Sequence, residues 1–500
     1  MDYKKLQNGS DVRGVALPGI EGQSVNLTET ACRDLARGFS VWLKKKLNKT
    51  DIKVAIGRDS RLSGKTLLGY FAETMADCGI SVTDFGMAST PAMFMSTVTE
   101  GYEFDASVMV TASHLPFNRN GFKFFTKNGG LEKEDVKSII AIAETDETTN
   151  FKKASVTTAE FMTAYSNLLV KKIQTATGME KPLEGFKIVV DAGNGAGGFF
   201  VSKVLNPLGA DTTGSRFLDP DGNFPNHIPN PENKEAMQSI KDAVKEVGAD
   251  FGIIFDTDVD RAGAVLSDGS ELNRNRIIAM LSAILLRDHK GTTIVTDSIT
   301  STGLKEFIES KGGVHHRFKR GYRNVINESI RLNALGKDSQ LAIETSGHGA
   351  LKENYFLDDG AYLITVLLIE LARGKKMGYT LESLIKDLKE PEESVEFRMN
   401  ILLEEFKPYG EEVIKKVTEF ASKTAGLSLC PDNYEGVRVN FDKEHGDGWF
   451  LLRLSLHDPL LPLNIESNTL GGAKIIAKII YDFLKDFDKL DVVSLEKFVK

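Results

Sequence analysis

The stretch FGIIFDTDVDR, residues 251–261, sets the pattern on which the fold prediction rests. Its apolar first half predicts a buried strand, and the aspartates directly after it predict a polar loop at the carboxyl end of that strand. Similar runs occur at KVAIG (53–57), SVMV (107–110), KIVVD (187–191), TIVTD (293–297) and QLAIE (340–344). Helical periodicity fills the gaps, at 30–47, 64–78, 159–173, 234–247, 273–287 and 358–373. Strands that alternate with helices in this way predict an α/β fold.

The strands form three successive pairs, and the second strand of each pair ends in the loop richest in reactive side chains. These loops are TASH (111–114), DTDVDR (256–261) and ETSGH (344–348). Ligands of open α/β sheets bind beyond the carboxyl ends of strands, so three copies of one architecture can each turn a loop toward a shared cleft. Three unrelated surface turns fit the same pattern.

The alternation of strands and helices ends after LKEPEES (388–394). A helical stretch at 404–422 then precedes strands near 434–440, 448–456 and 461–466 and a last helix at 470–485. This order predicts a smaller α+β domain. Together with the polar stretch 144–156, it predicts domains at 1–155, 156–288, 289–392 and 393–500. A chain of 500 residues is long enough for three or four domains.

Composition excludes several classes of protein. Hydrophobic residues make up 41% and charged residues 26%, as in ordinary globular proteins. The net charge of −8 argues against general nucleic-acid binding, so a phosphorylated ligand needs local basic residues. Candidates lie in or beside loops: Arg13, Arg58, Lys319, Arg320, Arg323 and Arg453.

The chain lacks signs of export, zinc binding or membrane insertion. Its three cysteines are far apart and without zinc spacing, which fits a reduced compartment. The start, MDYKKLQNGSDVRG, resembles neither a signal nor a transit peptide. The longest largely apolar stretch, 277–286, is too short for a membrane helix. We therefore expect a cytoplasmic protein with no membrane partner.

Ser113 follows a buried strand, and three roles fit that position. It can be a nucleophile, a phosphate carrier or a helix cap, and position alone favours the cap. A Ser-His-Asp hydrolase is disfavoured because the chain has no GxSxG elbow. The neighbouring His114 and Lys123, in NGFK, favour a chemical role.

Asp256, Asp258 and Asp260 alternate along one turn, so three carboxylates can face one hard cation such as Mg²⁺ or Ca²⁺. Arg261 and Ser267 stand where an EF-hand needs Gly and Glu. A solvated turn is the alternative, although a buried strand delivers these aspartates.

The loop ETSGHGA (344–350) offers a carboxylate, a hydroxyl and an imidazole from Glu344, Ser346 and His348. These groups can hydrogen-bond a polyol. By itself the motif is weak, because a histidine after a glycine is more often a turn residue.

In this order, the segments resemble the α-D-phosphohexomutase family of phosphoglucomutases and phosphomannomutases. TASH with NGFK resembles its phosphoserine loop, DTDVDR its metal loop, and ETSGH its sugar-recognition loop. Further matches are GSDVRG (9–14), VAIGRDSRLSG (54–64), STPAM (89–93), VVDAGNGAG (189–197) and PDGNFPNHIPNP (220–231). The resemblance implies three related α/β domains with mixed sheets and a C-terminal α+β domain around a central cleft.

The resemblance also implies a reaction. A phosphoryl group moves between O1 and O6 of a hexose phosphate, of glucose and/or mannose, through a hexose 1,6-bisphosphate that serves as intermediate and activator. Phosphorylated Ser113 donates the group, with Mg²⁺ on Asp256, Asp258, Asp260 and a phosphoserine oxygen. A monomer or homodimer is expected.

Further roles follow from the resemblance alone. Lys123 and His114 handle protons, while Arg13 and Arg261 steady the transferring group. Glu344 and Ser346 bind the sugar, helped by His348 and Lys319. Arg323, one of the basic candidates above, is a further predicted substrate-binding residue.

Two segments depart from the family pattern. Leu115 replaces an Asn after TASH, and the phosphate clamp RxSGTEP reads RLSLHDP at 453–459. Arg453 and Ser455 remain as phosphate donors, and His457 is a third candidate. A weakened clamp leaves two alternatives open: a hexose-1,6-bisphosphate synthase or phosphatase, or a non-catalytic sugar-phosphate sensor. The intact Ser113 and aspartates argue against the sensor.

Overall fold

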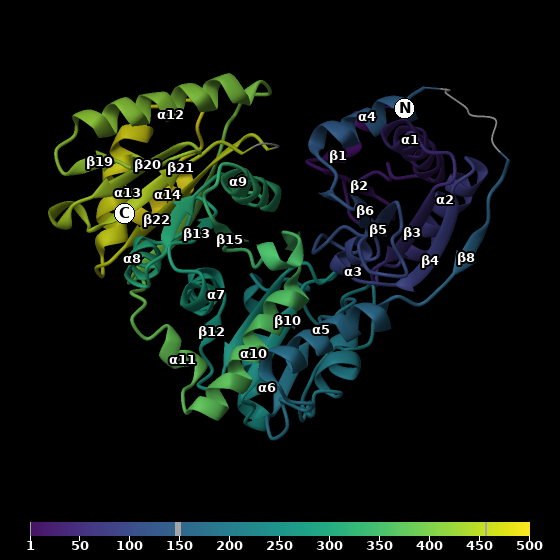
Figure 1. The fold of residues 1–500 in the computed structure, drawn as a ribbon. Coiled ribbons are helices and arrows are strands. Elements are labelled where there is room, and N and C mark those ends of the chain that lie inside the picture. The colour runs from purple at the N-terminus through teal and green to yellow at the C-terminus, as the bar shows by residue number, and fades with distance from the viewer. Residues whose placement is uncertain (1, 146–151, 456–457) are drawn as a thin grey trace. The chain divides into compact units, whose positions relative to one another are not determined.

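The computed structural model describes residues 2–145, 152–455 and 458–500, and its contacts divide the chain into two compact units (Figure 1). The first unit runs to Asn273 and includes Ser346–Ser383, and the second comprises Arg274–Thr345 and Leu384–Lys500. Among the described helices, none is long and apolar enough to span a membrane.

A mixed sheet forms the core of the N-terminal part of the first unit. Its strands run in the order β1-β2-β6-β5-β3-β4-β8, with β7 paired to β6. They are β1 (Gln7–Asn8), β2 (Asp11–Val15), β3 (Lys53–Arg58), β4 (Ser81–Met87), β5 (Ala106–Val110), β6 (Arg119–Thr126), β7 (Gly129–Gly130) and β8 (Val156–Thr158). The strands β5, β3, β4 and β8 are parallel, whereas β6 is antiparallel to both β2 and β5.

Helices cover both faces of this first sheet. The apolar sides of α1 (Glu29–Leu47), α2 (Gly64–Asp77) and α4 (Lys133–Ala143) share one core with alternate strand residues such as Val54 and Ile56. On the opposite face Gly57 lies against Met93 of the short helix α3 (Thr90–Met95). The predicted strands at 53–57 and 107–110 are confirmed.

A second mixed sheet follows in the same unit, with strand order β12-β11-β10-β9. Its strands are β9 (Ile188–Asp191), β10 (Phe251–Phe255), β11 (Ala262–Leu266) and β12 (Glu271–Leu272). Helix α6 (Lys234–Val247) packs its apolar side on this sheet, while α5 (Met162–Thr177) and α10 (Gly360–Met377) pack against each other (Figure 1). The unit also contains a π-helical turn (Val201–Leu205) and the antiparallel pair β16 (Gly349–Leu351) and β17 (Leu357–Asp358).

The second unit begins with a parallel sheet in the order β14-β13-β15. These strands are β13 (Thr293–Thr296), β14 (Val314–Arg317) and β15 (Ser339–Ile343), accompanied by α7 (Arg274–Asp288), α8 (Thr302–Ser310) and α9 (Tyr322–Ala334). Short helical segments elsewhere are Tyr3–Leu6, Lys352–Asn354, Lys443–His445 and α11 (Leu381–Leu384).

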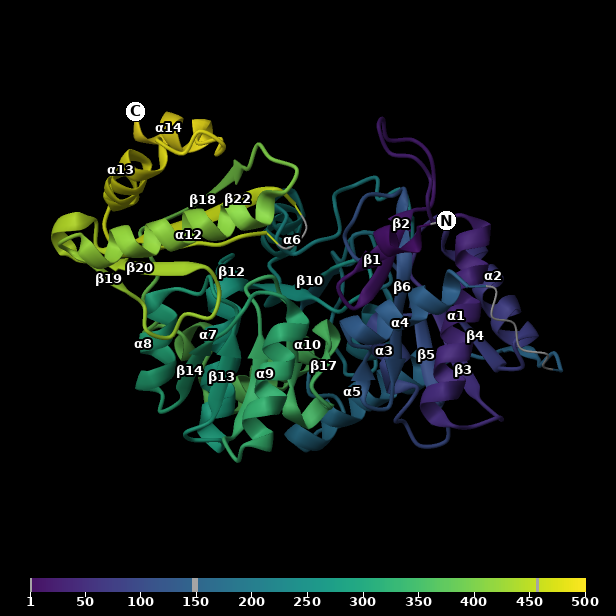
Figure 2. The same cartoon turned by 90° about the horizontal axis from the view of Figure 1, so that it is seen from above.

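The C-terminal part of the second unit is α+β, as predicted. An antiparallel sheet runs β18-β22-β21-β20-β19, and α12 and α13 pack on one of its faces (Figures 1 and 2). The elements are β18 (Glu393–Asn400), α12 (Phe406–Lys423), β19 (Leu427–Leu429), β20 (Val437–Phe441), β21 (Gly448–Leu452), β22 (Leu460–Ser467), α13 (Gly472–Leu484) and α14 (Val493–Val499).

The fold class is confirmed, with mixed sheets in the α/β part and an antiparallel sheet at the C-terminus. The four domain boundaries and the central cleft stay predictions. Strand β8, at 156–158, pairs with β4 of the first sheet although it lies just past the predicted boundary at 155.

Candidate active site

Ser113 lies in the loop that leaves β5, and it is 3% exposed. Its hydroxyl donates to Asp256 Oδ2 at 3.1 Å and accepts from Arg261 Nη2 at 2.9 Å. The backbone has a φ of +52°, a left-handed conformation that costs a non-glycine residue free energy and persists only where its surroundings hold it. No helix begins at Ser113 in the described chain, so the helix-cap alternative is wrong.

The three aspartates of the DTDVDR loop are buried between β10 and β11, each at most 1% exposed. Asp256, Asp258 and Asp260 each place a carboxylate oxygen within 4.8 Å of the others. Val259 has a φ of +68°, which is unusual for a β-branched residue and bends the chain back toward β11. The solvated-turn alternative is therefore wrong.

Basic groups neutralise part of this acidic cluster. Lys123, from the antiparallel strand β6, donates to Asp258 Oδ2 at 3.0 Å and also pairs with Asp260. Arg261 Nε donates to Asp256 Oδ2 at 3.1 Å. A buried ion cluster of this kind needs matched charges because desolvation of each ion is costly.

Two carboxylate oxygens in the cluster keep free coordination capacity. Within the described residues, Oδ1 of Asp258 and Oδ1 of Asp260 are buried without a hydrogen-bond partner. Buried polar atoms are normally satisfied, so two such oxygens within one carboxylate cluster fit a hard cation. The donor set suits Mg²⁺, which takes oxygen ligands from a few carboxylates.

The electrostatic environment shifts the pKa values of Asp256 and Asp260 in opposite directions. Burial and the charge of Asp260 raise the pKa of Asp256 well above its ordinary value. Burial also opposes ionisation of Asp260, but Lys123 and His348 outweigh it and hold the pKa of that carboxyl below its usual range.

His114 is a neutral imidazole beside the serine. Burial, together with the charges of Arg261 and Arg13, lowers the pKa of His114 to about 2. Its Nδ1 accepts from Arg261 Nη2 at 2.5 Å and lies 3.3 Å from Ser113 Oγ. Arg13, on β2, also pairs with Asp11 at 2.9 Å.

His348 is brought to the acidic cluster by a backbone bridge between its segment and Arg261. Its Nδ1 donates to Asp358 Oδ2 at 2.5 Å and lies 3.9 Å from Asp260 Oδ1. Burial disfavours the charged ring, but Asp358 and Asp260 outweigh it and raise the pKa of His348 to about 9. The nearby Ser346 is buried, and among described residues its hydroxyl has no hydrogen-bond partner.

The second unit holds the other predicted residues. Glu344 directly follows β15 and accepts from the backbone N–H of Gly321 at 2.6 Å, which ties it to the loop of Lys319 and Arg320, just before Arg323 in the first turn of α9. That loop leads into α9, and Lys319 is exposed. One carboxylate oxygen of Glu344 is thus already engaged.

Arg453 follows β21 and is half-buried, and its Nε has no hydrogen-bond partner among the described residues. Burial and the neighbouring charge of Arg320 lower the pKa of Arg453, while Glu435 and Glu396 act in the opposite direction. The guanidinium groups of Arg453 and Arg320 can together bind an anion.

The rest of the altered clamp is described only in part. Ser455 Oγ accepts from the Asp458 N–H at 3.2 Å. Leu456 and His457 lie outside the described residues, so the role of His457 stays a prediction.

Sequence reasoning missed several groups that contact the predicted residues. Asp358, which pairs with His348, was assigned only to the start of a helix. Thr90 donates to Asp258 Oδ2 at 2.5 Å. Its segment, STPAM, matches the family pattern, and this match could have pointed to Thr90. Glu435 accepts from Ser298 Oγ at 2.6 Å and from the Arg320 N–H at 3.2 Å, without any recognisable motif.

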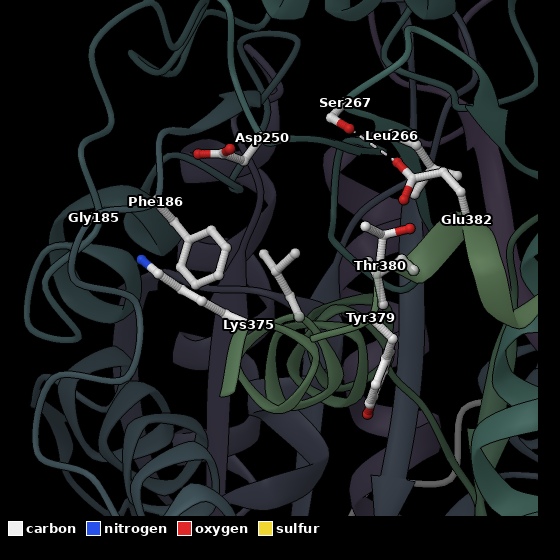
Figure 3. Close-up of a pocket in the computed structure, with 11 residues that line it drawn as sticks. Gly185, Phe186, Asp250, Leu266, Ser267, Lys375, Tyr379, Thr380 and Glu382 are labelled. Carbon is white, nitrogen blue, oxygen red and sulfur yellow. Dashed lines mark hydrogen bonds between the residues drawn. The ribbon is translucent and has the colours of Figure 1, made fainter. Parts of the chain in front are cut away.

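A pocket of about 310 Å³ in the first unit shares no residue with this site (Figure 3). Phe186 and Leu266 supply apolar walls, and Lys375 lies over the Phe186 ring at 4.4 Å. Glu382 accepts from Ser267 at 3.0 Å on the opposite side (Figure 3).

Models of known protein families match three consecutive parts of the chain. Models of phosphoglucomutase/phosphomannomutase alpha/beta/alpha domains I, II and III match residues 4–150, 163–269 and 273–390. The chain belongs to the phosphoglucomutase/phosphomannomutase family.

Individual family members match nearly the whole chain. A phosphoglucomutase of Neisseria gonorrhoeae is 32% identical over 90% of this chain and 91% of its own length. A phosphomannomutase/phosphoglucomutase of Pseudomonas syringae pv. tomato is 31% identical over 88% of each. The crystal structure of a family protein from Burkholderia thailandensis, 26% identical, covers 97% of this chain and 98% of its own with a TM-score of 0.77.

Proposed function

We propose that this hexose-phosphate mutase carries the transferred phosphoryl group on Ser113 and moves it between O1 and O6 of glucose and mannose phosphates. Mutase activity itself follows from family membership. The observation that carries the assignment of Ser113 is the direct contact of its hydroxyl with both Asp256 and Arg261. A hexose 1,6-bisphosphate is the proposed intermediate and activator.

The groups around Ser113 have complementary tasks. Arg261 lies within hydrogen-bond distance of Ser113 Oγ and can stabilise negative charge on a phosphoryl group there. His114 is neutral, so its second ring nitrogen can donate a hydrogen bond without adding charge. Arg13 adds positive charge toward the same side.

Asp256, Asp258 and Asp260 are the proposed Mg²⁺ ligands, together with an oxygen on phosphorylated Ser113. When bound, the ion supplies charge neutralisation at the phosphoryl oxygens. Lys123 is the proposed proton-transfer group at the attacking hydroxyl. Two carboxylates pair with the Lys123 ammonium, so the charged form can donate a proton to the sugar oxygen when that oxygen is the leaving group. Only the neutral form can accept the proton of the attacking hydroxyl.

Residues of the second unit are assigned to recognition. Arg453 and Ser455 are the proposed ligands of the phosphate that is not transferred, with Lys319 and Arg323 as further basic groups. Glu344 is proposed to bind sugar hydroxyls through the oxygen that does not accept from Gly321. Ser346 and His348, in the same ETSGH segment of the sequence, are further proposed sugar-binding residues.

Coupled assays with glucose 1-phosphate and mannose 1-phosphate, each with and without glucose 1,6-bisphosphate, test this proposal. We expect turnover with the wild type and none with Ser113→Ala. The matched control is Ser40→Ala, which removes another buried serine hydroxyl, one that donates to the Ala36 carbonyl within helix α1. Wild-type turnover by Ser113→Ala would overturn the assignment, and net release of bisphosphate or inorganic phosphate would favour a synthase or phosphatase.

A further inference from the structure

Arg61, from the GRDSRLSG segment, has no part in the proposed chemistry, yet it is 1% exposed. Its guanidinium donates to four backbone carbonyls of the serine loop. Nη2 donates to the carbonyls of Ser113 and, at 2.6 Å, Leu115. Nη1 donates to those of Pro116 at 2.9 Å and Arg119 at 3.0 Å. One side chain therefore joins both ends of the loop that runs from β5 to β6.

The position of Arg61 is itself fixed from the other side. Its guanidinium forms an ion pair with Asp59, with Nε 3.4 Å from Oδ2, and its backbone N–H donates to Asp59 Oδ1 at 2.9 Å. Asp59 Oδ2 accepts from Thr111 Oγ1 at 2.6 Å. Thr111 Oγ1 in turn accepts from the Ser113 N–H at 3.0 Å. Asp59 thus connects to Ser113 through Arg61 at its carbonyl and through Thr111 at its amide.

A second segment encloses the guanidinium. The Phe224 ring lies 5.3 Å from the Arg61 guanidinium carbon, a cation–π distance. Gly222 packs so closely that an added Cβ would come within 2.6 Å of Ser60 O. Water therefore has little access to compete for the four carbonyls, and hydrogen bonds gain strength away from water.

These contacts divide the loop into two sides. The Ser113 carbonyl is turned to Arg61, whereas its hydroxyl is turned to Asp256 and Arg261. The left-handed φ of Ser113 lets one residue present these groups to different partners. Released from Arg61, the loop would relax toward a less strained conformation and displace the hydroxyl.

We propose that Arg61 is a positioning residue that holds the loop in its left-handed conformation and thereby aims Ser113 Oγ for phosphoryl transfer. This inference rests on the proposed role of Ser113. Arg61 does not touch the hydroxyl, so its loss acts through the loop. A displacement of about 1 Å can lower a rate about 100-fold.

Two substitutions test this role. Arg61→Ala removes all four donors, and Arg61→Lys keeps the charge but its single ammonium cannot span four carbonyls. We expect kcat and the rate of Ser113 phosphorylation by glucose 1,6-bisphosphate to fall about 100-fold in Arg61→Ala and about tenfold or more in Arg61→Lys. KM for glucose 1-phosphate is expected to change less than threefold, because binding groups remain.

Two readouts separate positioning from general stability. Amide hydrogen exchange is expected to rise in the peptide 111–121 and little elsewhere, and added guanidinium is expected to restore part of kcat in Arg61→Ala. The control is Arg37→Met, because Arg37 also donates to a backbone carbonyl, that of Ala143, at 3.0 Å. It is expected to keep wild-type kcat.

The outcomes are distinct. Wild-type kcat with unchanged exchange in Arg61→Lys would overturn the inference, and so would lost kcat with no change in the loop peptide. If Arg61→Ala does not fold, Arg61→Lys decides alone by the same two measurements. Failure of the wild type to become phosphorylated on Ser113 would instead overturn the proposed function.

Discussion

Replacing Arg453 is expected to weaken substrate binding, and the size of the effect can be estimated from the burial and hydrogen bonding of its guanidinium. The guanidinium is half-buried, faces Arg320, and among described residues its Nε makes no hydrogen bond. A phosphate bound there loses charged hydrogen bonds in Arg453→Met, at about 1.5–3 kcal/mol. Since about 1.4 kcal/mol is a factor of ten, this predicts a rise in KM of roughly 10- to 150-fold.

The assay compares KM and kcat for glucose 1-phosphate in three variants. Arg453→Lys keeps the charge but loses the planar fork, so its KM is expected to lie between those of wild type and Arg453→Met. The control is Arg398→Met, on β18 of the same sheet, because the Arg398 side chain is 72% exposed. It is expected to leave KM unchanged.

The result that would refute the reasoning is a KM in Arg453→Met within twofold of the wild type. The phosphate anchor would then have to be another basic group, such as Arg323 or Lys319. If the anchor is Arg453, the altered loop is also expected to release bisphosphate more often than relatives with the full RxSGTEP sequence. Turnover would then depend visibly on added glucose 1,6-bisphosphate.

Three further predictions address the metal, the packing and the pH response. Exhaustive chelation is expected to abolish turnover and Mg²⁺ to restore it, because Asp258 and Asp260 each keep an oxygen without a hydrogen-bond partner in the described part of the chain. Full activity without metal would exclude the site. Gly121→Ala would press a methyl group against the Val12 carbonyl, and we expect it to lower the free energy of unfolding by about 1–3 kcal/mol in urea titrations. Gly69→Ala, in α2, has space for the added methyl group and is expected to raise the free energy of unfolding. Burial disfavours the charged ring of His227, but Asp191 outweighs burial and raises the pKa of His227 above 6.5. The folded state therefore binds the His227 proton more tightly than the unfolded state does. The stabilisation from this proton is complete below pH 6.5 and is lost as the pH rises through the folded-state pKa. His227→Gln is expected to reduce this loss as the pH rises above about 6.5, and an equal loss in both proteins would contradict it.

Several strands that are buried on both faces were predictable from the sequence, whereas β6 and β11 are also buried and were not predicted. Runs such as FGIIF contain few residues that fit anything except a buried strand, and β10 occupies 251–255 as expected. Strand β18, at 393–400, was missed because it begins within a polar segment read as a linker. Its alternation of Val395, Phe397 and Met399 was the available signal.

The candidate site was predictable in its residues but not in its pairings. Lys123 and Asp260 are 137 positions apart and belong to segments of two different sheets, so only the tertiary structure brings them together. The carbonyl contacts of Arg61 depend on the backbone direction of a loop, which no side-chain pattern encodes. Glu344 is a further example, because this residue was predicted to bind the sugar and its carboxylate also accepts a hydrogen bond from a backbone N–H.

Intact-mass measurement with peptide mapping, after incubation with glucose 1,6-bisphosphate, tests most directly whether Ser113 carries the phosphoryl group. The account predicts one added phosphate, located on Ser113, that is lost on addition of glucose 1-phosphate with formation of bisphosphate. Ser113→Ala is expected to remain unmodified under the same conditions. An enzyme that turns over hexose phosphate while Ser113 stays unmodified, or while another residue carries the phosphate, would contradict the central claim.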